Sequence, residues 1–390
     1  MTRSFARQTA IVGIGATEFS KNSGRSELQL AGEAVLAAVA DAGLKPSEVD
    51  GLTTFTMETN SEIEVAKTAG LGDLTFFSKI GYGGGAACAT VQQAAIAVAT
   101  GVADNVVCYR AFNERSGHRF GSGAHRGEPT SEGIAMGWVS AFGLMTPASW
   151  VAMFAQRYMH EYGATSADFG LVSVADRKHA ATNPKAWFYQ QPITLEDHQK
   201  SRWIVEPLHL LDCCQETDGG QALVVTTVER ARDLGRPFAV VSGAAQGSAV
   251  GQQSMVSYYR DDIAGLPEMG LVATQLWKQS GLGPEDIQTA VIYDHFTPFV
   301  LQQLEEFGFC KRGEAKDFIA GGAIELGGRL PINTHGGQLG EAYLHGMNGI
   351  AEGVRQIRGT SVNQVPDVEN VLVTAGTGVP TSGLVLSADR

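Results

Sequence analysis

The stretch G-L-G-P-E-D-I-Q-T-A at residues 281–290 repeats an earlier one, G-L-K-P-S-E-V-D-G-L at residues 43–52. Each copy follows a segment with the periodicity of an amphipathic helix, residues 30–42 in the first case and 271–280 in the second. Each copy also leads into an apolar strand. A repeat of this kind, with the same neighbours on both sides, indicates one folding unit that is used twice.

The sequence further from these two copies repeats in the same order. Each half opens with an apolar strand that ends in glycine, T-A-I-V-G-I-G at 9–15 and F-A-V-V-S-G at 238–243. Near the end of each half lies a second apolar strand, N-V-V-C-Y at 105–109 and N-V-L-V-T at 370–374. Apolar strands that alternate with helices predict an α/β fold with mostly buried sheets.

The organisation of the chain follows from this repeat. Residues 84–100 predict a helix that is apolar nearly all round, and such a helix belongs between layers. We therefore expect two sheets that pack through shared helices. The first half is predicted to span residues 1–236 and the second residues 237–390, with a non-repeating inserted region at about 112–236 in the first.

The composition limits the class of protein. The 390 residues are 44% hydrophobic and 18% charged, as in globular proteins that are soluble. A net charge of −12 without a basic cluster argues against a nucleic-acid partner. The sequence has no apolar run of 18 residues and no secretory signal, so we expect a cytoplasmic protein without a membrane span.

The cysteines predict neither a disulfide framework nor a metal site. Their number is odd, and no C-x-x-C pair is present, so we expect no zinc and no other metal. The five residues are Cys88, Cys108, Cys213, Cys214 and Cys310.

One segment near the C-terminus resembles a known family. G-G-Q-L-G-E-A-Y-L-H-G-M-N-G at 336–349 is similar to the glycine-histidine-proline segment of thiolases, and a gapless match places Tyr343 on the catalytic histidine. The segments 207–222 and 160–163 resemble the sterol-carrier-protein-x branch of that superfamily. The resemblance covers nearly the whole chain. It implies a thiolase fold, in which two similar βαβ-rich halves stack as a five-layer αβαβα sandwich.

The chain departs from the thiolase pattern at the catalytic positions. Counting back from A-T-G at 99–101, which thiolases share, the position of the nucleophilic cysteine falls on Gly84. Y-D-H-F matches the family's histidine-aspartate-cysteine-phenylalanine segment, with Tyr293 in the histidine place and His295 in the cysteine place. No cysteine follows Cys310, so the second catalytic thiol of the family is absent.

Two alternative interpretations stay open at the level of sequence. If C-A-T at 88–90 is aligned with the family's C-A-T-G, Cys88 becomes the nucleophile of a thiolase, an acetyl-CoA acyltransferase. That alignment shortens the helix by four residues, and otherwise Cys88 is a core residue. The other alternative is a non-catalytic protein of thiolase fold that binds acyl-CoA or lipid.

Tyrosines in place of the catalytic residues resemble the steroid side-chain aldolases of this branch, which are often named lipid-transfer proteins. The resemblance implies cleavage of a 17-hydroxy-steroid 20-carboxyl-CoA thioester to a 17-ketosteroid and propionyl-CoA. CoA then arrives with the substrate, and no separate cofactor is expected. The resemblance also implies a homodimer, in complex with an OB-fold domain-of-unknown-function (DUF35) protein of a MaoC-like hydratase.

A retro-aldol cleavage needs a base, an acid and donors for the thioester enolate, but no covalent nucleophile. Two converging phenols suit the acid–base work. Side chains alternate along a strand, so a strand over 291–296 places Tyr293 and His295 on one face and Asp294 on the other. The predicted catalytic residues are Tyr293, Tyr343, His295 and His345.

Backbone N–H groups of glycine at a helix start are suited to stabilise an enolate. Gly84 and Gly85 offer such groups, and Gly378 in the T-G-V-P turn at 377–380 offers another. Asn348 lies near an expected helix start, where it either binds substrate or caps the helix.

Overall fold

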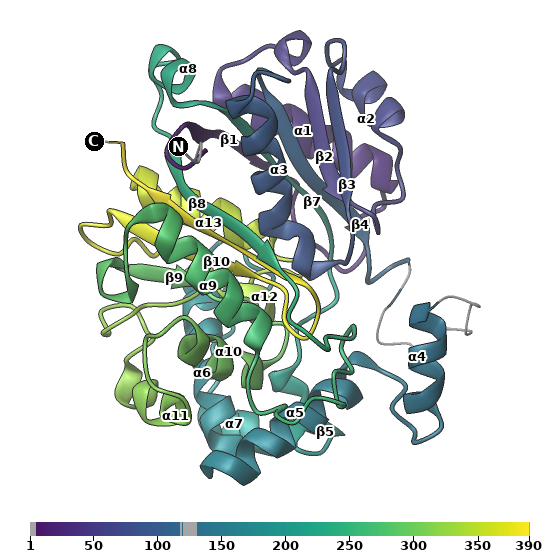
Figure 1. Ribbon diagram of the computed structural model, residues 1–390, viewed down its shortest axis with the longest axis vertical. Coiled ribbons are helices and arrows are strands. Elements are labelled where there is room, and N and C mark those ends of the chain that lie inside the picture. Colours follow the sequence, from purple (N-terminus) through teal and green to yellow (C-terminus); the bar gives the residue numbers. More distant parts are fainter. Residues whose placement is uncertain (1–4, 118, 120–130, 390) are drawn as a thin grey trace.

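The computed structural model describes residues 5–117, 119 and 131–389 (Figure 1). Its centre is a nine-stranded sheet of order β3-β2-β4-β7-β1-β8-β11-β10-β9. The strands are β1 (Thr9–Ala16), β2 (Gly51–Phe55), β3 (Phe76–Ile80), β4 (Val106–Asn113), β7 (Asp218–Thr227), β8 (Ala239–Gly247), β9 (Thr289–Val291), β10 (Asn370–Ala375) and β11 (Thr381–Ser387). A small second sheet pairs β5 (Trp203–Val205) with β6 (Leu208–His209).

The strand order confirms the internal repeat. Outward from the middle of the sheet, β1-β7-β4-β2 in the first half corresponds to β8-β11-β10-β9 in the second. In both runs the first two pairings are antiparallel and the third is parallel. Strand β3 extends the first half alone, parallel to β2.

The expectation of two separate sheets was wrong in one respect. Strands β1 and β8 pair through Ala10–Val240 and Ile11–Ala239, so the two half-sheets join at this edge. The physical reason is that each half begins with the equivalent antiparallel strand, and the open edges of these two strands satisfy each other's backbone groups.

The helices complete a five-layer order. Helix α1 (Glu27–Ala42) covers β1, β4 and β7, and α9 (Pro267–Ser280) covers β8 and β11. Helices α3 (Ala87–Ala99) and α13 (Met347–Arg358) contact strands of both halves and therefore lie between them (Figure 1). Helix, sheet, helix, sheet and helix follow one another, as the resemblance to thiolases implies.

Glycine positions explain why these layers pack as they do. Both outer helices end at a left-handed glycine, Gly43 with φ 76° and Gly281 with φ 72°, the first residue of each repeated stretch. A Cβ on Gly13 or on Gly15 would lie 2.2 Å from a backbone atom of Ala38, so α1 crosses β1 where no side chain fits.

The inserted region packs on the second half. Apolar side chains of α5 (Pro147–Tyr162) and α6 (Ser166–Thr182) share one core cluster with those of α9 and α10 (Thr297–Glu306). The boundary at residues 236–237 stays a prediction. The other helices are α2 (Glu62–Ala69), α4 (Ser131–Ser140), α7 (Leu195–Lys200), α8 (Val228–Asp233), α11 (Ala315–Phe318) and α12 (Gly337–Gly340).

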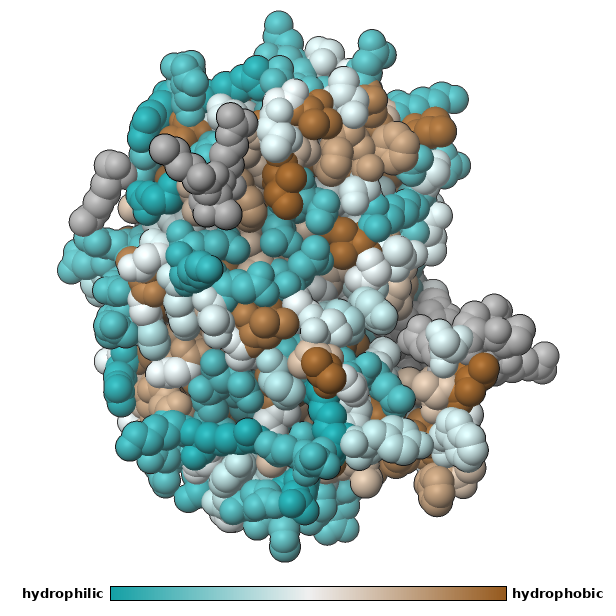
Figure 2. Space-filling model, in the orientation of Figure 1, coloured by the Kyte–Doolittle hydropathy of each residue, from teal (hydrophilic) through white to brown (hydrophobic). Residues whose placement is uncertain are grey.

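The face of the molecule shown in Figure 2 is mainly polar, with scattered apolar residues. Helix α4 projects from the body (Figure 1) and exposes Ile134 and Trp138. Within the described ranges, none of the helices combines the length and the apolar content that crossing a membrane requires.

Candidate active site

The structure brings Tyr293 and Tyr343 together. Tyr293 follows β9 by two residues, and Tyr343 lies in the turn between α12 and α13. Both side chains are buried, and their hydroxyl oxygens are 3.3 Å apart. The backbone N–H of Tyr293 donates to Thr374 Oγ1, and that of Tyr343 donates to Thr217 Oγ1. Backbone hydrogen bonds therefore hold both phenols where they meet.

The tyrosine pair lies against the turn that opens α3. Gly84 begins a short 3₁₀ turn, and a Cβ on Gly84 would lie 1.8 Å from the Tyr293 hydroxyl oxygen. A Cβ on Gly83 would lie 2.8 Å from His345 Nε2. The phenol and the imidazole thus fill the space that side chains at these two positions would need. The resemblance placed the thiolase nucleophile at Gly84, and here a phenol oxygen takes that space.

Each predicted histidine lies against one tyrosine. The ring centroids of His295 and Tyr293 are 4.9 Å apart, and so are those of His345 and Tyr343. His295 Nδ1 lies 3.1 Å from Thr377 Oγ1. The structure therefore assembles all four residues that were predicted to be catalytic.

The strand expected over residues 291–296 is not formed. Strand β9 ends at Val291, because the chain turns there toward α10. The preference for His295 over Asp294 nevertheless agrees with the structure. Asp294 is turned away and accepts hydrogen bonds from the backbone N–H groups of Gln338 and Leu339.

Burial keeps the four predicted catalytic side chains uncharged. It raises the pKa of Tyr293 and of Tyr343 above the ordinary value for a phenol. It lowers the pKa of His295 to about 3, and burial followed by the charge of Arg110 lowers the pKa of His345. At neutral pH the site therefore contains two phenols and two neutral imidazoles, with neither a phenolate nor an imidazolium.

Sequence reasoning missed Glu114, which follows β4 directly. Its side chain is 3% exposed, and its Oε2 has no hydrogen-bond partner in the part of the chain that the structure describes. Burial and then the charge of Glu216 raise its pKa. The backbone N–H of Thr217 donates to this carboxyl group, and Thr217 Oγ1 accepts from Tyr343 N–H. No sequence signal marked Glu114, because a carboxylate next to a loop is usually solvated.

Cys214 was also missed as a site residue. Its backbone N–H donates to the His295 carbonyl at 2.8 Å. Burial and then Glu114 raise the pKa of the thiol, so it is a neutral neighbour of the pair. The segment 207–222, which carried part of the family resemblance, was the available signal.

The predicted enolate donors differ in accessibility. Gly84 is partly exposed, whereas Gly85 is buried, and a Cβ on Gly85 would lie 1.9 Å from the Pro380 carbonyl oxygen. Gly378 has φ 67°, and its carbonyl accepts from the N–H of Met255 at 2.5 Å. The role of these glycines as donors stays a prediction.

Asn348 does not cap α13. Gly346 is the N-cap, so Asn348 lies within the first turn, where it is fully buried. Its Nδ2 donates to Glu341 Oε2 at 2.9 Å and to the Ala342 carbonyl at 3.1 Å. These bonds hold the segment that leads into Tyr343, and a contact of Asn348 with substrate stays a prediction.

Cys88 lies in the core of the molecule. It is fully buried in α3, one turn beyond Gly84, and its Sγ points to the Val373 carbonyl at 3.7 Å. Burial raises the pKa of the thiol, which is the opposite of what a nucleophilic cysteine needs. The structure therefore gives no support to the interpretation of Cys88 as a nucleophile.

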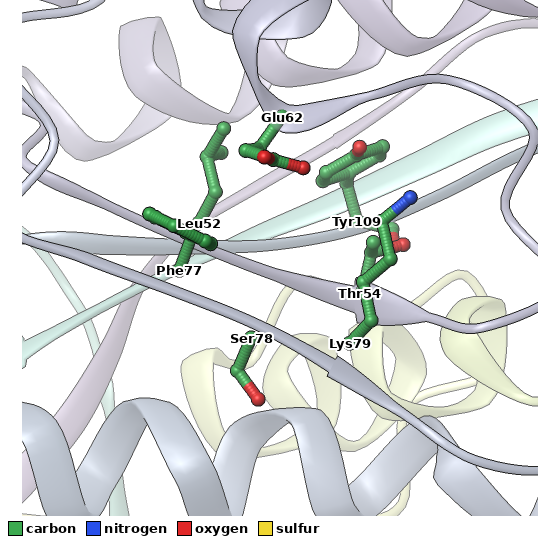
Figure 3. A pocket seen from close by; sticks show the side chains of 7 residues that line it. All are labelled: Leu52, Thr54, Glu62, Phe77, Ser78, Lys79 and Tyr109. Carbon is green, nitrogen blue, oxygen red and sulfur yellow. The ribbon is translucent and has the colours of Figure 1, made fainter.

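A small pocket opens beside β3, and neither Tyr293 nor Tyr343 lines it (Figure 3). The side chains that line it are Leu52, Thr54, Glu62, Phe77, Ser78, Lys79 and Tyr109. Tyr109 and Arg110 are neighbours on β4 and point to opposite faces of the sheet, with Arg110 on the face of His345.

Within the described residues, no group of three or more His, Cys, Asp or Glu side chains could hold a metal ion.

Comparisons with known proteins show which family this chain is similar to. A family model for the thiolase C-terminal domain matches residues 249–387. A steroid side-chain-cleaving aldolase of Thermomonospora curvata is 74% identical over 98% of both chains. A 17-hydroxy-3-oxo-4-pregnene-20-carboxyl-CoA lyase of Mycobacterium tuberculosis is 73% identical over 97% of this chain and 99% of its own.

Among solved structures, one described as "Ltp2-ChsH2(DUF35) aldolase" superposes with a TM-score of 0.96. It is 72% identical in sequence, and the match covers 99% of both chains. Sequence identity at this level over nearly the full length of both chains shows the family as well as the fold. The chain belongs to the steroid side-chain-cleaving aldolases, carbon–carbon lyases that have a thiolase fold.

Proposed function

We propose that this chain cleaves the C17–C20 bond of a 17-hydroxy steroid that carries a 20-carboxyl-CoA thioester, and that Tyr293 and Tyr343 carry the acid–base catalysis. The products are a 17-ketosteroid and propionyl-CoA. The contact between the two hydroxyl groups, at 3.3 Å in a buried site, is the observation that carries the catalytic role. The printed activity of the M. tuberculosis relative supports the substrate.

The reaction balances without a covalent intermediate. The 17-hydroxyl proton passes to one phenol oxygen as that phenol gives its own proton to the other phenol. The C17–C20 bond breaks, C17 becomes a ketone, and the electron pair of that bond gives the departing fragment the character of a thioester enolate. As it receives the proton from its neighbour, the second phenol gives its own proton to C20, which yields propionyl-CoA. Both tyrosines are therefore neutral phenols again when the products form.

Because both phenols are neutral, a proton relay between them is favoured over a mechanism in which one tyrosine is already ionised and acts as the base. Because burial raises the pKa of both tyrosines, a phenolate at neutral pH would be costly. A hydrogen-bonded pair avoids that cost, since each phenol accepts one proton as it gives up another. Neither tyrosine has to carry a full charge between turnovers.

The enolate oxygen is stabilised at the start of α3. Gly83 and Gly84 are partly exposed, and both adjoin the side chains that reach the reacting atoms. Backbone N–H groups at a helix N-terminus favour a developing negative charge. Gly84 and Gly85 supply these N–H groups, Gly378 adds a further one, and Asn348 binds the substrate.

The chain acts as a cytoplasmic homodimer together with a DUF35 protein of a MaoC-like hydratase. The description of the solved relative, which includes a DUF35 protein, supports that partner. The outer edge of β3 supports the dimer, because β3 is the terminal strand of the sheet and Phe77 on it is 61% exposed.

The deciding experiment removes one hydroxyl group at a time. Tyr293→Phe and Tyr343→Phe should each lower turnover by about 10²-fold or more, because each loses a proton-transferring group. Mass spectrometry of the products from a 17-hydroxy-steroid 20-carboxyl-CoA, with the DUF35 partner present, measures this. Tyr259→Phe is the control, since Tyr259 is 79% exposed. Wild-type turnover in both variants, with circular dichroism unchanged, rejects the assignment.

A further inference from the structure

Arg110 is a buried cation within β4 that sequence reasoning did not single out. Its side chain is 0% exposed and pairs with the equally buried Glu58, Nη1 to Oε2, at 2.9 Å. Nη1 also donates to the carbonyls of Met57 and Ala111 at 3.2 Å. The guanidinium therefore keeps both its charge and a fixed orientation. In proteins arginine does not lose its proton, so all its nitrogens are donors only.

The remaining bond of Arg110 determines the tautomer of His345. Arg110 Nε donates to His345 Nδ1 at 3.3 Å. Since Nε cannot accept, Nδ1 must present its lone pair. Burial and the charge of Arg110 hold the pKa of His345 well below its ordinary value, so the ring is neutral. A neutral imidazole with a bare Nδ1 carries its proton on Nε2.

The fold fixes where that Nε2–H points. The ring of His345 lies 6.0 Å from the rings of Phe55 and Phe112 and 4.9 Å from that of Tyr343, centroid to centroid. Its backbone has φ 53°, a left-handed conformation that a non-glycine residue adopts only where its surroundings impose it. The Nε2 edge therefore stays against Gly83.

Gly83 is next to the residue that faces the catalytic phenol. A Cβ on Gly83 would lie 2.8 Å from His345 Nε2, and a Cβ on Gly84 would lie 1.8 Å from the Tyr293 hydroxyl oxygen. The Nε2–H, the phenol and the N-terminus of α3 therefore converge on two consecutive residues. Negative charge that develops at this point is the charge of the thioester oxygen, if the proposed function holds.

We propose that Arg110 is a positioning residue which locks His345 as its Nε2–H tautomer, and that this Nε2–H donates to the oxygen of the thioester enolate. His345 is then an electrophilic catalyst and not the acid or base that sequence reasoning predicted. With its proton on Nε2, the nitrogen that faces the site has no lone pair with which to take a proton. The donor role rests on the proposed function, whereas the tautomer does not.

The tautomer is measured without any substrate. In the full chain with ¹⁵N-labelled histidine, the His345 signals are those that disappear in His345→Gln. Between pH 5 and 8 we expect Nδ1 to resonate as a bare nitrogen and Nε2 as a protonated one. In Arg110→Lys, which keeps the charge beside Glu58 but loses the Nε donor, we expect a mixture of tautomers. A protonated Nδ1 in the wild-type chain overturns the proposal.

The turnover of His345 variants tests whether the Nε2–H of His345 donates to the enolate oxygen. The side-chain amide of glutamine places an N–H near the position of Nε2 but cannot act as a base. We expect His345→Ala to lower kcat by about 10²-fold or more, as for loss of one oxyanion donor. His345→Gln should restore at least about tenfold of that loss, since a donor returns. Equal kcat values for the two variants overturn the donor role and favour a base.

A matched control separates positioning from general stability. Arg260 forms another ion pair, with Glu268 at 2.8 Å, in which the two side chains are 9% and 1% exposed, and it is remote from His345 in the sequence. Arg110→Lys should lower kcat about tenfold with KM unchanged, because the donor is misdirected in part of the molecules. Arg260→Lys should leave kcat unchanged. Equal losses in the two variants show a merely structural effect and overturn the positioning role.

These measurements also separate this proposal from the function on which it rests. If Tyr293→Phe and Tyr343→Phe retain full turnover, the proposed function fails, whatever the NMR signals of His345 show. If both tyrosine variants are inactive but His345→Gln is no better than His345→Ala, only the role of His345 fails.

Discussion

The two halves of the molecule share one strand order but contribute differently to the site. The first half contributes backbone, since Gly83 and Gly84 at the start of α3 leave room for side chains from elsewhere. The second half contributes the side chains, with Tyr293 before α10 and Tyr343 before α13. A repeated fold thus brings two equivalent helix starts to one point, where the glycine of one half leaves room for the phenols of the other.

The same ring contacts both helix starts. A Cβ on Gly84 would lie 1.8 Å from the Tyr293 hydroxyl oxygen, and a Cβ on Gly346, the N-cap of α13, would lie 3.1 Å from the Tyr293 ring. The first contact leaves no space at all, and the second is merely tight. Substitutions at the two glycines therefore measure how much each half constrains the phenol.

The largest effect is expected at Gly84. In Gly84→Ala the new methyl group must displace the phenol, and a displacement of about 1 Å costs roughly 10²-fold in turnover. The assay of Tyr293→Phe serves here as well. Gly81→Ala is the matched control, because a Cβ on Gly81 meets nothing within 4 Å. If Gly84→Ala keeps wild-type activity, the phenol does not work from the position described.

A smaller effect is expected at Gly346. Its φ of 86° is left-handed, so Gly346→Ala should lower the free energy of unfolding by about 1–2 kcal/mol. Crowding of the Tyr293 ring should lower turnover on the order of tenfold. Gly359→Ala is the control, since Gly359 has φ 69° but open space beside it. The two variants should lose similar stability in urea unfolding, and only Gly346→Ala should lose turnover.

The buried carboxyl group of Glu114 should make the free energy of unfolding depend on pH. Its pKa is raised in the folded chain, so the folded state binds a proton that the unfolded state releases above about pH 4.3. Stability therefore falls as pH rises through that range, until the folded carboxyl group also ionises. Glu114→Gln cannot ionise, and it should melt on the order of a few degrees higher at neutral pH. At pH 4 the difference should vanish.

The control for Glu114 is the exposed Glu229. Glu229→Gln removes the same formal charge from the surface, and thermal unfolding followed by circular dichroism compares the two variants. An equal shift in both would mean that net charge, and not burial of Glu114, produces the effect.

The smallest effect is expected at Cys88. Its buried thiol has no access to the site, so Cys88→Ala should keep turnover within about twofold of the wild type. In a thiolase that used Cys88 as its nucleophile, the same substitution would abolish activity, because no acyl-cysteine could form. Labelling by an acyl-CoA analogue, followed by mass spectrometry, checks the same point.

Much of the fold could be predicted because the repeat is local in sequence. The glycine-proline stretches at 43–52 and 281–290 mark the ends of the two outer helices, and the structure confirms both. The join between β1 and β8 could not be predicted, since apolar strands with equal patterns do not specify which edges pair. The expected strand at 291–296 failed for a similar reason, because alternation over six residues does not show where the chain turns.

The site divides in the same way. Tyr293, Tyr343, His295 and His345 were predicted because each occupies, or adjoins, a position that the family resemblance marks. Glu114 and Arg110 were not predicted. A carboxylate near a loop and an arginine in an apolar strand carry no signal until burial and partners are known, since identical residues elsewhere are solvated.

The sequence by itself determined the repeated α/β architecture, the absence of a cysteine at Gly84, and the tyrosines at the former histidine positions. These are properties of residue type and order. Only the tertiary structure decided that the two phenols touch, that Arg110 donates to His345, and that the Glu114 carboxyl group is buried. Such facts depend on distances between residues far apart in the chain, and packing alone determines those distances.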